Sequence, residues 1–178
     1  TQDELLGMVF LLLVAGHETT VSLIANGTRA LLENPDQWEL LKSEPDRIET
    51  AVEELLRYDA PLETTEISFA AEPITLHGVT IPQGAAVLPA ILSANRDEAA
   101  FENADTLDIT RTPNKHLSFG KGIHYCLGAP LARLEGKIAF CSLMQQMPNL
   151  RLAVPSNALE YEAIPMVHRL KELPILAA

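Results

Sequence analysis

The first part of the chain is a helical pattern with apolar residues on nearly every side. Residues 1–4 have the form of a capping box, in which a hydroxyl is followed three positions later by a carboxylate. The pattern continues to about Leu32, and the Asn-Pro pair that follows soon after ends it. A helix that is apolar all round is typical of a protein interior, so we expect the run at residues 5–16 to be buried.

The rest of the chain combines shorter helices with short strands. A helical pattern recurs over residues 35–42, 45–58 and 127–147, and Pro130 falls in the first turn of the last, where a missing N–H is tolerated. Between residues 62 and 88, apolar and polar residues alternate around two turn sequences, which predicts short antiparallel strands. We therefore expect a mainly α fold with small antiparallel β-sheets.

Composition and charge narrow the class of protein. With 178 residues, of which 47% are hydrophobic, the chain can bury the core of one domain. A net charge of −11 argues against nucleic acid and against anionic membrane surfaces as partners. The run at residues 5–16 is shorter than the ~20 residues that span a bilayer, and no basic leader precedes it, so we expect neither a membrane helix nor a signal peptide. Two cysteines give no disulfide framework, which favours a cytoplasmic protein.

A glycine-rich run at residues 119–128, FGKGIHYCLG, places one thiol directly before the last long helix. Cys126 should therefore lie near the start of that helix, where unpaired backbone N–H groups and the positive end of the helix dipole favour an anion. These conditions hold a cysteine as the thiolate, the form that ligates metal. The glycines lack a Cβ, so the backbone can turn sharply and lie close to a flat cofactor. The run predicts a thiolate ligand presented from a loop.

Two other interpretations of the thiol stay open from the residues alone. A lone cysteine is most often a small buried hydrophobe, and this is the interpretation that we favour for Cys141 in the middle of a helix. A zinc site could use His116, His124, Cys126 and Cys141. That set lacks the paired spacing of the usual zinc motifs, so we rank it well below a single thiolate ligand presented from the loop.

The order of residues in this run resembles the cysteine signature of the cytochrome P450 superfamily, and the continuation APLARLE resembles its bacterial soluble branch. The resemblance implies a partial cytochrome P450 fold, from the central oxygen-binding helix to the C-terminus. It implies that Cys126 is the axial ligand of haem iron, with haem b (iron protoporphyrin IX) as the cofactor. His124 would donate to a haem propionate, while Phe119, Gly120 and Gly128 complete the haem-binding loop.

A second motif, AGHETT, lies at residues 15–20 inside the first helix. A glycine there costs ~1 kcal/mol relative to alanine, and a threonine hydroxyl can bond the carbonyl four residues back, which loosens the helix. From the residues alone, a solvated helix face explains these polar groups better than a functional site does. By resemblance, Thr19 supports the protonation of dioxygen and Glu18 feeds its proton relay. Ala15 and Gly16 would then leave room at the haem.

Glu54 and Arg57 lie three residues apart on one face of a predicted helix. By itself such a pair is a surface contact worth about a few tenths of a kcal/mol. By resemblance it is the family's structural pair, which fixes the loop before the cysteine. Two departures from the family pattern bear on the rigidity of this loop and on the anchoring of haem. Ser68 stands where relatives carry an arginine for a haem propionate, and Thr106 stands where an arginine completes the Glu-Arg network.

The family's members are roughly twice as long as this chain, so the resemblance implies that residues 1–178 are a C-terminal haem-binding portion without the N-terminal half. The implied activity is that of a haem-dependent monooxygenase, which inserts one atom of O2 into a C–H bond of a small hydrophobic substrate. Electrons would come from NAD(P)H through a ferredoxin or flavodoxin-type donor. This portion alone should be inactive, because its substrate cavity would be open to water. The alternative is a truncated, non-catalytic binding or scaffold domain.

Two sets of residues extend this interpretation. The predicted substrate pocket is mostly apolar and includes Val14, Ala15, residues 62–65 and the Met166-Val167 pair. Basic residues surround the cysteine loop, and they fit a docking patch for an electron donor or scattered solvated charges equally well. They are Arg111, Lys115, Lys121, Arg133 and Lys137.

Overall fold

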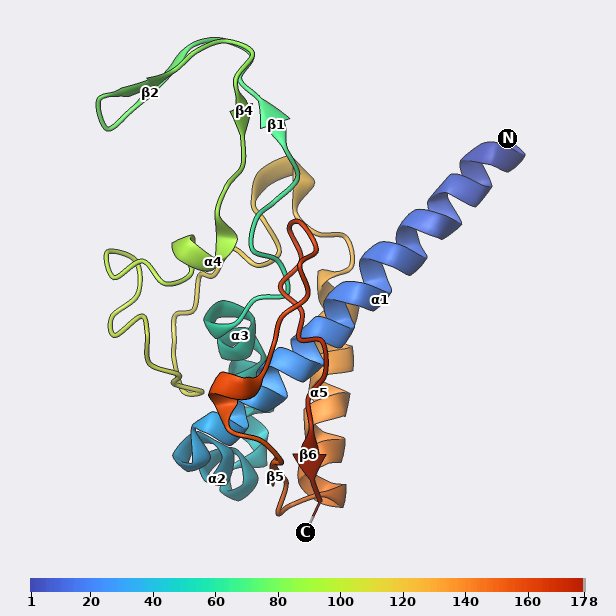
Figure 1. Ribbon diagram of the computed structural model, residues 1–178, viewed down its shortest axis with the longest axis vertical. Coiled ribbons are helices and arrows are strands. Elements are labelled where there is room, and N and C mark those ends of the chain that lie inside the picture. Colours follow the sequence, from blue (N-terminus) through green and yellow to red (C-terminus); the bar gives the residue numbers. More distant parts are fainter. Residues whose placement is uncertain (178) are drawn as a thin grey trace.

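The computed structural model describes residues 1–177, and helices form most of its frame (Figure 1). The helices are α1 (Gln2–Glu33), α2 (Pro35–Ser43), α3 (Ile48–Tyr58), α4 (Ile91–Ala94) and α5 (Ala129–Gln146). The predicted capping box at the start of α1 is confirmed, because the Glu4 N–H donates to the Thr1 hydroxyl and the Glu4 carboxylate accepts from the terminal amine.

Two predicted helix boundaries differ from the observed ones. The helix predicted from residue 45 begins as a separate 3-10 turn, Pro45–Arg47, and α3 starts only at Ile48. The helix predicted from residue 127 begins at Ala129, with Pro130 in its first turn as expected, because the preceding residues belong to the cysteine loop. That loop contains a second 3-10 turn, Gly122–His124, and a third lies at Ser156–Ala158.

The strands form three two-stranded antiparallel sheets. β1 (Ser68–Phe69) pairs with β4 (Ala86–Val87), and β2 (Ile74–Leu76) pairs with β3 (Val79–Ile81). Together they make a ribbon that projects away from the helices at the top of Figure 1. β5 (Arg151–Leu152) pairs with β6 (Ile175–Leu176) at the opposite end. The predicted fold class, mainly α with small antiparallel sheets, is confirmed.

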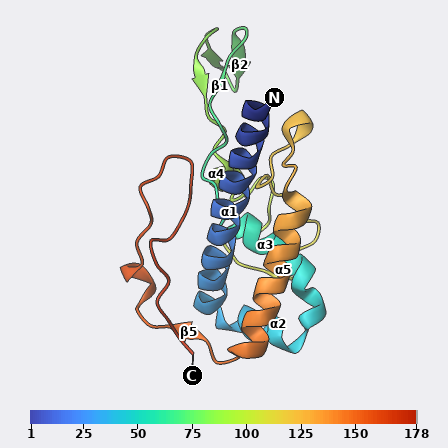
Figure 2. The ribbon, with the colours of Figure 1, turned by 90° about the vertical axis from the view of Figure 1, so that its right-hand side faces the viewer.

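The core lies where the second half of α1 packs against α3 and α5, with α2 closing one end (Figure 2). The approach of α1 and α5 is very close at Gly27, where an added Cβ would lie only 2.6 Å from Cζ of Phe140. A larger residue at this crossing would therefore have to displace the Phe140 ring. The main buried side chains are Leu23, Leu31, Trp38, Leu41, Val52, Leu55, Leu56 and Phe140.

The first half of α1 extends beyond this core, and the prediction that residues 5–16 are buried is wrong for the described chain. No segment within residues 1–177 packs against that half, so its apolar side chains meet solvent. The exposed ones include Leu5, Leu6, Met8, Val9, Phe10, Leu11, Leu12, Leu13 and Val14. By length and composition alone, α1 could cross a membrane, with a mean hydropathy of 1.7 over an 18-residue window. The core helix of a soluble protein meets the same criterion, and the second half of α1 has that character.

Candidate functional site

The cysteine loop holds one thiol at the molecular surface. Cys126 is exposed and unpaired, and its backbone N–H donates to the carbonyl of Phe119 at 2.9 Å, which closes the loop on itself. Gly120 and Gly122 adopt φ angles of +70° and +82°, a region that side chains disfavour. A Cβ at Gly128 would approach the Cys126 sulfur to 3.8 Å. The glycines therefore shape a turn that keeps the sulfur accessible just before α5.

The loop is fastened to α3 and α5 by an aromatic ring and an ion pair. The guanidinium of Arg133 on α5 lies over the ring of Phe119, 4.5 Å from its centroid. The same guanidinium donates to both carboxylate oxygens of Glu53 on α3, at 2.6 and 2.9 Å, and to the Tyr125 hydroxyl at 3.1 Å. His116 also bonds Glu53, at 3.1 Å. Residues before and after the cysteine loop are thus tied to one carboxylate.

This carboxylate remains ionised over a wide pH range. Burial raises the pKa of Glu53, but hydrogen bonds and charge from Arg133 and His116 outweigh it and lower the pKa to about 2. The hydrogen bond to Glu53 in turn raises the pKa of Arg133, against the opposing effect of burial. The sequence interpretation missed Glu53, although it stands next to Glu54. The signal that could have identified Glu53 is its position one residue before Glu54 on the same helix.

Behind the loop, Glu54 and Arg57 are fully buried and form a bidentate pair with two N–H···O bonds of 2.8 Å. Arg57 also donates to three backbone carbonyls, those of Asn95, Ala104 and Thr106. With five N–H donors available on a guanidinium, these five bonds satisfy it. The interpretation of the pair as a surface contact is therefore excluded.

The network around Glu54 has a second guanidinium although Thr106 stands at the family's arginine position. Nε of Arg111 lies 3.1 and 3.2 Å from the two Glu54 oxygens and supplies the second guanidinium. The Asp108 N–H and the Asn114 amide also donate to Glu54, at 2.9 and 3.0 Å. Residue 106 contributes only its carbonyl, so the identity of its side chain matters little. The segment at residues 104–114 is consequently pinned to α3.

Asn95, in the segment after α4, connects this network by hydrogen bonds to the residues before the cysteine loop. Asn95 gives its carbonyl to Arg57, while its side-chain oxygen accepts the Leu117 N–H at 2.8 Å and its amide donates to the Ser118 hydroxyl at 2.9 Å. Ser118 in turn donates to the Leu56 carbonyl at 2.7 Å. The residues directly before Phe119 are therefore fixed by α3, a role for Asn95 that the sequence interpretation did not identify.

The AGHETT motif lies in the part of α1 where the helix leaves the core, and α1 continues through it without a break. The Thr19 hydroxyl donates to the Ala15 carbonyl at 2.6 Å, as the sequence predicted. A Cβ at Gly16 would meet no described atom within 4 Å, so this side of the helix is open. Glu18 forms an ion pair with Arg169 from the C-terminal segment. Ala15 and Gly16 are exposed, whereas Glu18 and Thr19 are half-buried.

Other predicted residues are not brought together. Within residues 1–177, no group of three or more His, Cys, Asp or Glu side chains is placed to hold a metal ion, so the zinc set is not assembled. His116 is bound to Glu53, and Cys141 packs beside the core. His124 is exposed in its 3-10 turn, and Ser68 is exposed in β1.

The predicted basic patch is largely neutralised by α3. Arg111, Arg133 and Lys137 are bonded to Glu54, Glu53 and Glu49 respectively. Lys115 and Lys121 are exposed. The local positive charge is therefore smaller than the sequence interpretation allowed.

The surroundings of the sulfur fit a flat, apolar, iron-containing group. The two most exposed apolar side chains of the loop flank Cys126: Ile123 is 97% exposed and Leu127 is 88% exposed. A thiolate is a soft ligand that suits haem iron, and apolar side chains suit a porphyrin face. The loop therefore offers one metal ligand and an apolar rim.

Comparison with known proteins agrees with this geometry. The sequence matches the family described as cytochrome P450 over residues 1–153. Cytochrome P450 CYP107DY1 of Priestia megaterium is 49% identical over 176 residues, which are 99% of this chain and 42% of that protein. The vitamin D(3) 25-hydroxylase of Pseudonocardia autotrophica is also 49% identical, over 98% of this chain and 43% of its own length. The tirandamycin C-bound P450 monooxygenase TamI has a TM-score of 0.97 at 43% identity, covering 100% of this chain and 45% of that one.

This chain belongs to the cytochrome P450 family. The predicted family and the predicted partial cytochrome P450 fold are thereby confirmed. The chain spans less than half the length of the curated relatives that it matches.

Proposed function

We propose that this chain is the C-terminal, haem-binding portion of a bacterial cytochrome P450 monooxygenase. The observation that carries the proposal is the exposed Cys126 thiol, held by a glycine-rich loop at the start of α5. The reaction class follows from the family and the relatives, one of which is named a vitamin D(3) 25-hydroxylase. The cofactor would be haem b, with Cys126 holding its iron.

Bound haem would supply the activation of O2 and the insertion of one oxygen atom into a substrate C–H bond. The residues of this chain would hold and serve that group. Phe119, Gly120 and Gly128 would shape the loop around the ligand, and His124, exposed and close to it in sequence, would donate to a propionate.

Helix α1 would supply the proton-handling groups. Ala15 and Gly16 would leave space beside the helix, because no described atom lies within 4 Å of a Cβ at Gly16. Glu18 would deliver protons and Thr19 would direct them with its hydroxyl, which the Ala15 carbonyl holds in one orientation. Glu54 and Arg57 would act only on structure, by fixing the segments that lead to the loop.

The experiment uses the two cysteines of the chain as a matched pair. The protein is expressed with a supply of haem, reduced, and exposed to CO, and its Soret band is recorded. We expect a thiolate-type Soret position for the wild type and for Cys141→Ala, and its loss in Cys126→Ala. A Cys126→Ala variant that keeps the band would contradict the ligand assignment. A wild-type chain that folds by circular dichroism and binds no haem would favour the non-catalytic scaffold instead.

The whole enzyme's partners are part of the same proposal. The substrate would be a small hydrophobic molecule, because the predicted pocket residues are mostly apolar, and O2 would be the co-substrate. Electrons would arrive from NAD(P)H through a ferredoxin or flavodoxin-type donor. We propose that the donor docks over the face between α3 and α5, where Arg133 and Lys137 line a groove of about 440 Å³. Because glutamates neutralise both cations, shape would contribute more to docking than charge.

Two expectations concern the chain alone. We propose a cytoplasmic location, since the second half of α1 packs into a helical core of the kind found in water-soluble proteins. We also expect no turnover from the 178-residue chain by itself, because the exposed side of α1 would leave a substrate open to water.

A further inference from the structure

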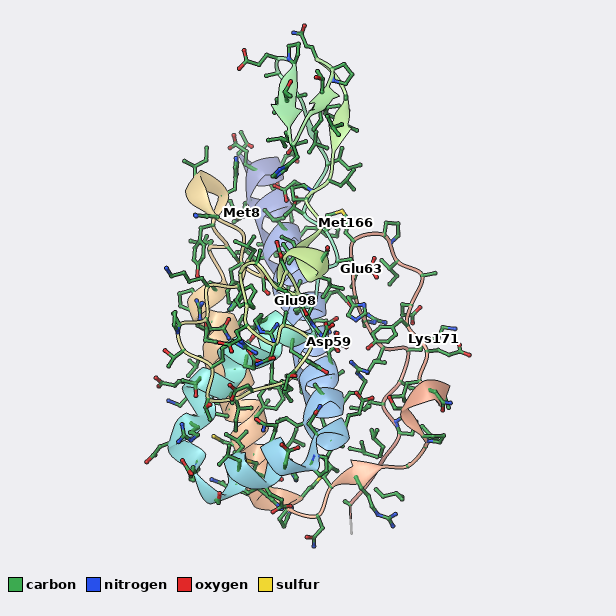
Figure 3. All side chains as sticks on the ribbon, turned by 90° about the vertical axis from the view of Figure 1, so that its left-hand side faces the viewer. Met8, Asp59, Glu63, Glu98, Met166 and Lys171 are labelled. Carbon is green, nitrogen blue, oxygen red and sulfur yellow. The ribbon has the colours of Figure 1, made fainter. Side chains whose placement is uncertain are left out.

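The C-terminal segment returns to the site as an irregular hairpin with Met166 at its turn (Figure 3). Tyr161 and Leu170 pair across it, and the Glu162 N–H donates to the Arg169 carbonyl at 2.8 Å. The turn is bonded to the loop that follows α3. The Glu63 N–H donates to the Met166 carbonyl at 2.8 Å, and the His168 N–H donates to the Pro61 carbonyl, also at 2.8 Å. The predicted pocket residues 62–65 and 166–167 therefore form one backbone unit.

Side chains attach this hairpin to α1 and α3. His168 bonds Asp59 at the end of α3, with 2.9 Å between Nε2 and Oδ1, and its ring stacks on Tyr161 at 4.2 Å between centroids. The buried Asn26 of α1 donates to the His168 carbonyl at 2.9 Å. Asp59 also accepts from Arg29 of α1 at 2.8 Å. The hairpin thus has a fixed position relative to the core half of α1.

The next residue, Arg169, reaches further along α1, to Glu18. Its Nη1 pairs with the Glu18 carboxylate across 151 residues of sequence, and its Nη2 lies 3.7 Å from the Glu162 carboxylate of the same hairpin. The three side chains are 28%, 41% and 33% exposed, in the order Arg169, Glu18, Glu162. One guanidinium therefore faces two carboxylates, and the second of them, Glu162, belongs to the same hairpin as Arg169.

We propose that Arg169 is a positioning residue for Glu18. It holds the carboxylate toward the C-terminal hairpin, and it links that carboxylate to the segment that carries Met166 and Val167. A substrate that displaces the turn would also move Arg169, and Glu18 would then be free to turn toward Thr19. This inference rests on the proposed function for the role of Glu18 in proton delivery, but the contact itself does not depend on haem.

The test follows the Glu18 carboxylate directly in the 178-residue chain without haem. The side-chain carboxyl carbons of glutamate are labelled with 13C, and the Glu18 resonance is assigned by its absence in Glu18→Gln. We expect Arg169→Gln to move this resonance to the position of a solvated glutamate and Arg169→Lys to restore it in part, because lysine keeps the charge but not the planar fork. The matched control is Lys171→Gln, which breaks an exposed pair with Glu160 on the same hairpin and should leave Glu18 unchanged.

A second measurement tests whether the contact between Arg169 and Glu18 also stabilises the turn at Met166. The Glu63 amide, which donates to Met166, should exchange with D2O about two- to five-fold faster in Arg169→Gln, as expected for loss of a partly exposed ion pair. An unmoved Glu18 resonance in Arg169→Gln, or an equal effect in Lys171→Gln, would overturn the proposal. Because neither readout involves haem, these outcomes are distinct from a failure of the chain to give the thiolate-type Soret band.

Discussion

Replacing Glu54 by glutamine removes one negative charge from the buried network and keeps the shape of the side chain. The carboxylate accepts hydrogen bonds from Arg57, Asp108, Arg111 and Asn114. In Glu54→Gln, one oxygen becomes an NH2 group that faces these donors. Arg57, which is fully buried, and Arg111, whose side chain is 11% exposed, then keep their charges without a carboxylate between them.

The expected loss of stability is large. Removing one partner of a buried ion pair costs about 3–5 kcal/mol, because the remaining charge stays out of water. The whole free energy of unfolding of a domain is only about 5–15 kcal/mol. Glu54→Gln should therefore lower the urea midpoint severely or prevent folding.

The chain contains a matched control with the same residue types and spacing. Glu44 and Arg47 also lie three residues apart, with a 2.6 Å contact, but their side chains are 49% and 39% exposed. Glu44→Gln should cost at most about 1 kcal/mol. Both variants are compared with the wild type by urea unfolding followed in the far-ultraviolet circular dichroism, with equal m-values as the condition for comparison. If Glu54→Gln costs no more than Glu44→Gln, the buried network does not stabilise this fold.

Two further predictions concern the core and the cysteine loop. Gly27→Ala should destabilise the fold by about 1–3 kcal/mol, because the new Cβ would meet Phe140 at 2.6 Å. Gly7→Ala, in the open half of the same helix, is the control and should stabilise the fold by about 0.5–1 kcal/mol. Similar urea midpoints for the two variants would refute the packing argument. The pKa of Glu53 is lowered from 4.5 to about 2, so its ionised carboxylate should add about 1–3 kcal/mol to the free energy of unfolding. This stabilisation is fully present above pH 4.5 and disappears as the pH falls to about 2. The difference in free energy of unfolding between wild type and Glu53→Gln should shrink across that interval, and a difference that does not change with pH would rule out the ion pair with Arg133 as its cause.

Local features of the fold were predictable because local rules govern them. The capping box at Thr1 and the proline near the end of the pattern set the limits of α1 to within a residue or two. The hydroxyl bond of Thr19 followed from its spacing to Ala15. The cysteine loop was predictable for the same reason, since its glycines and Cys126 are adjacent in sequence.

Long-range partners were not predictable, because their sequence spacing carries no signal. Glu54 and Arg57 were recognised as a pair, but the donation from Arg111 depends on how residues 104–114 fold back over α3. The same holds for Arg169 and Glu18, which are 151 positions apart. The prediction that residues 5–16 are buried failed for a different reason. An apolar pattern tells which surface prefers to leave water, and it does not tell whether another segment is available to cover it.

The open half of α1 also sets the conditions under which this chain can be handled. The exposed leucine, valine and phenylalanine side chains of this half favour self-association, because two copies can bury them against each other. Midpoints of unfolding should therefore rise with protein concentration, as they do for any process in which copies bind in the native state alone. Light scattering over a dilution series measures this self-association, so its contribution to the midpoint can be separated from the intrinsic stability of the core.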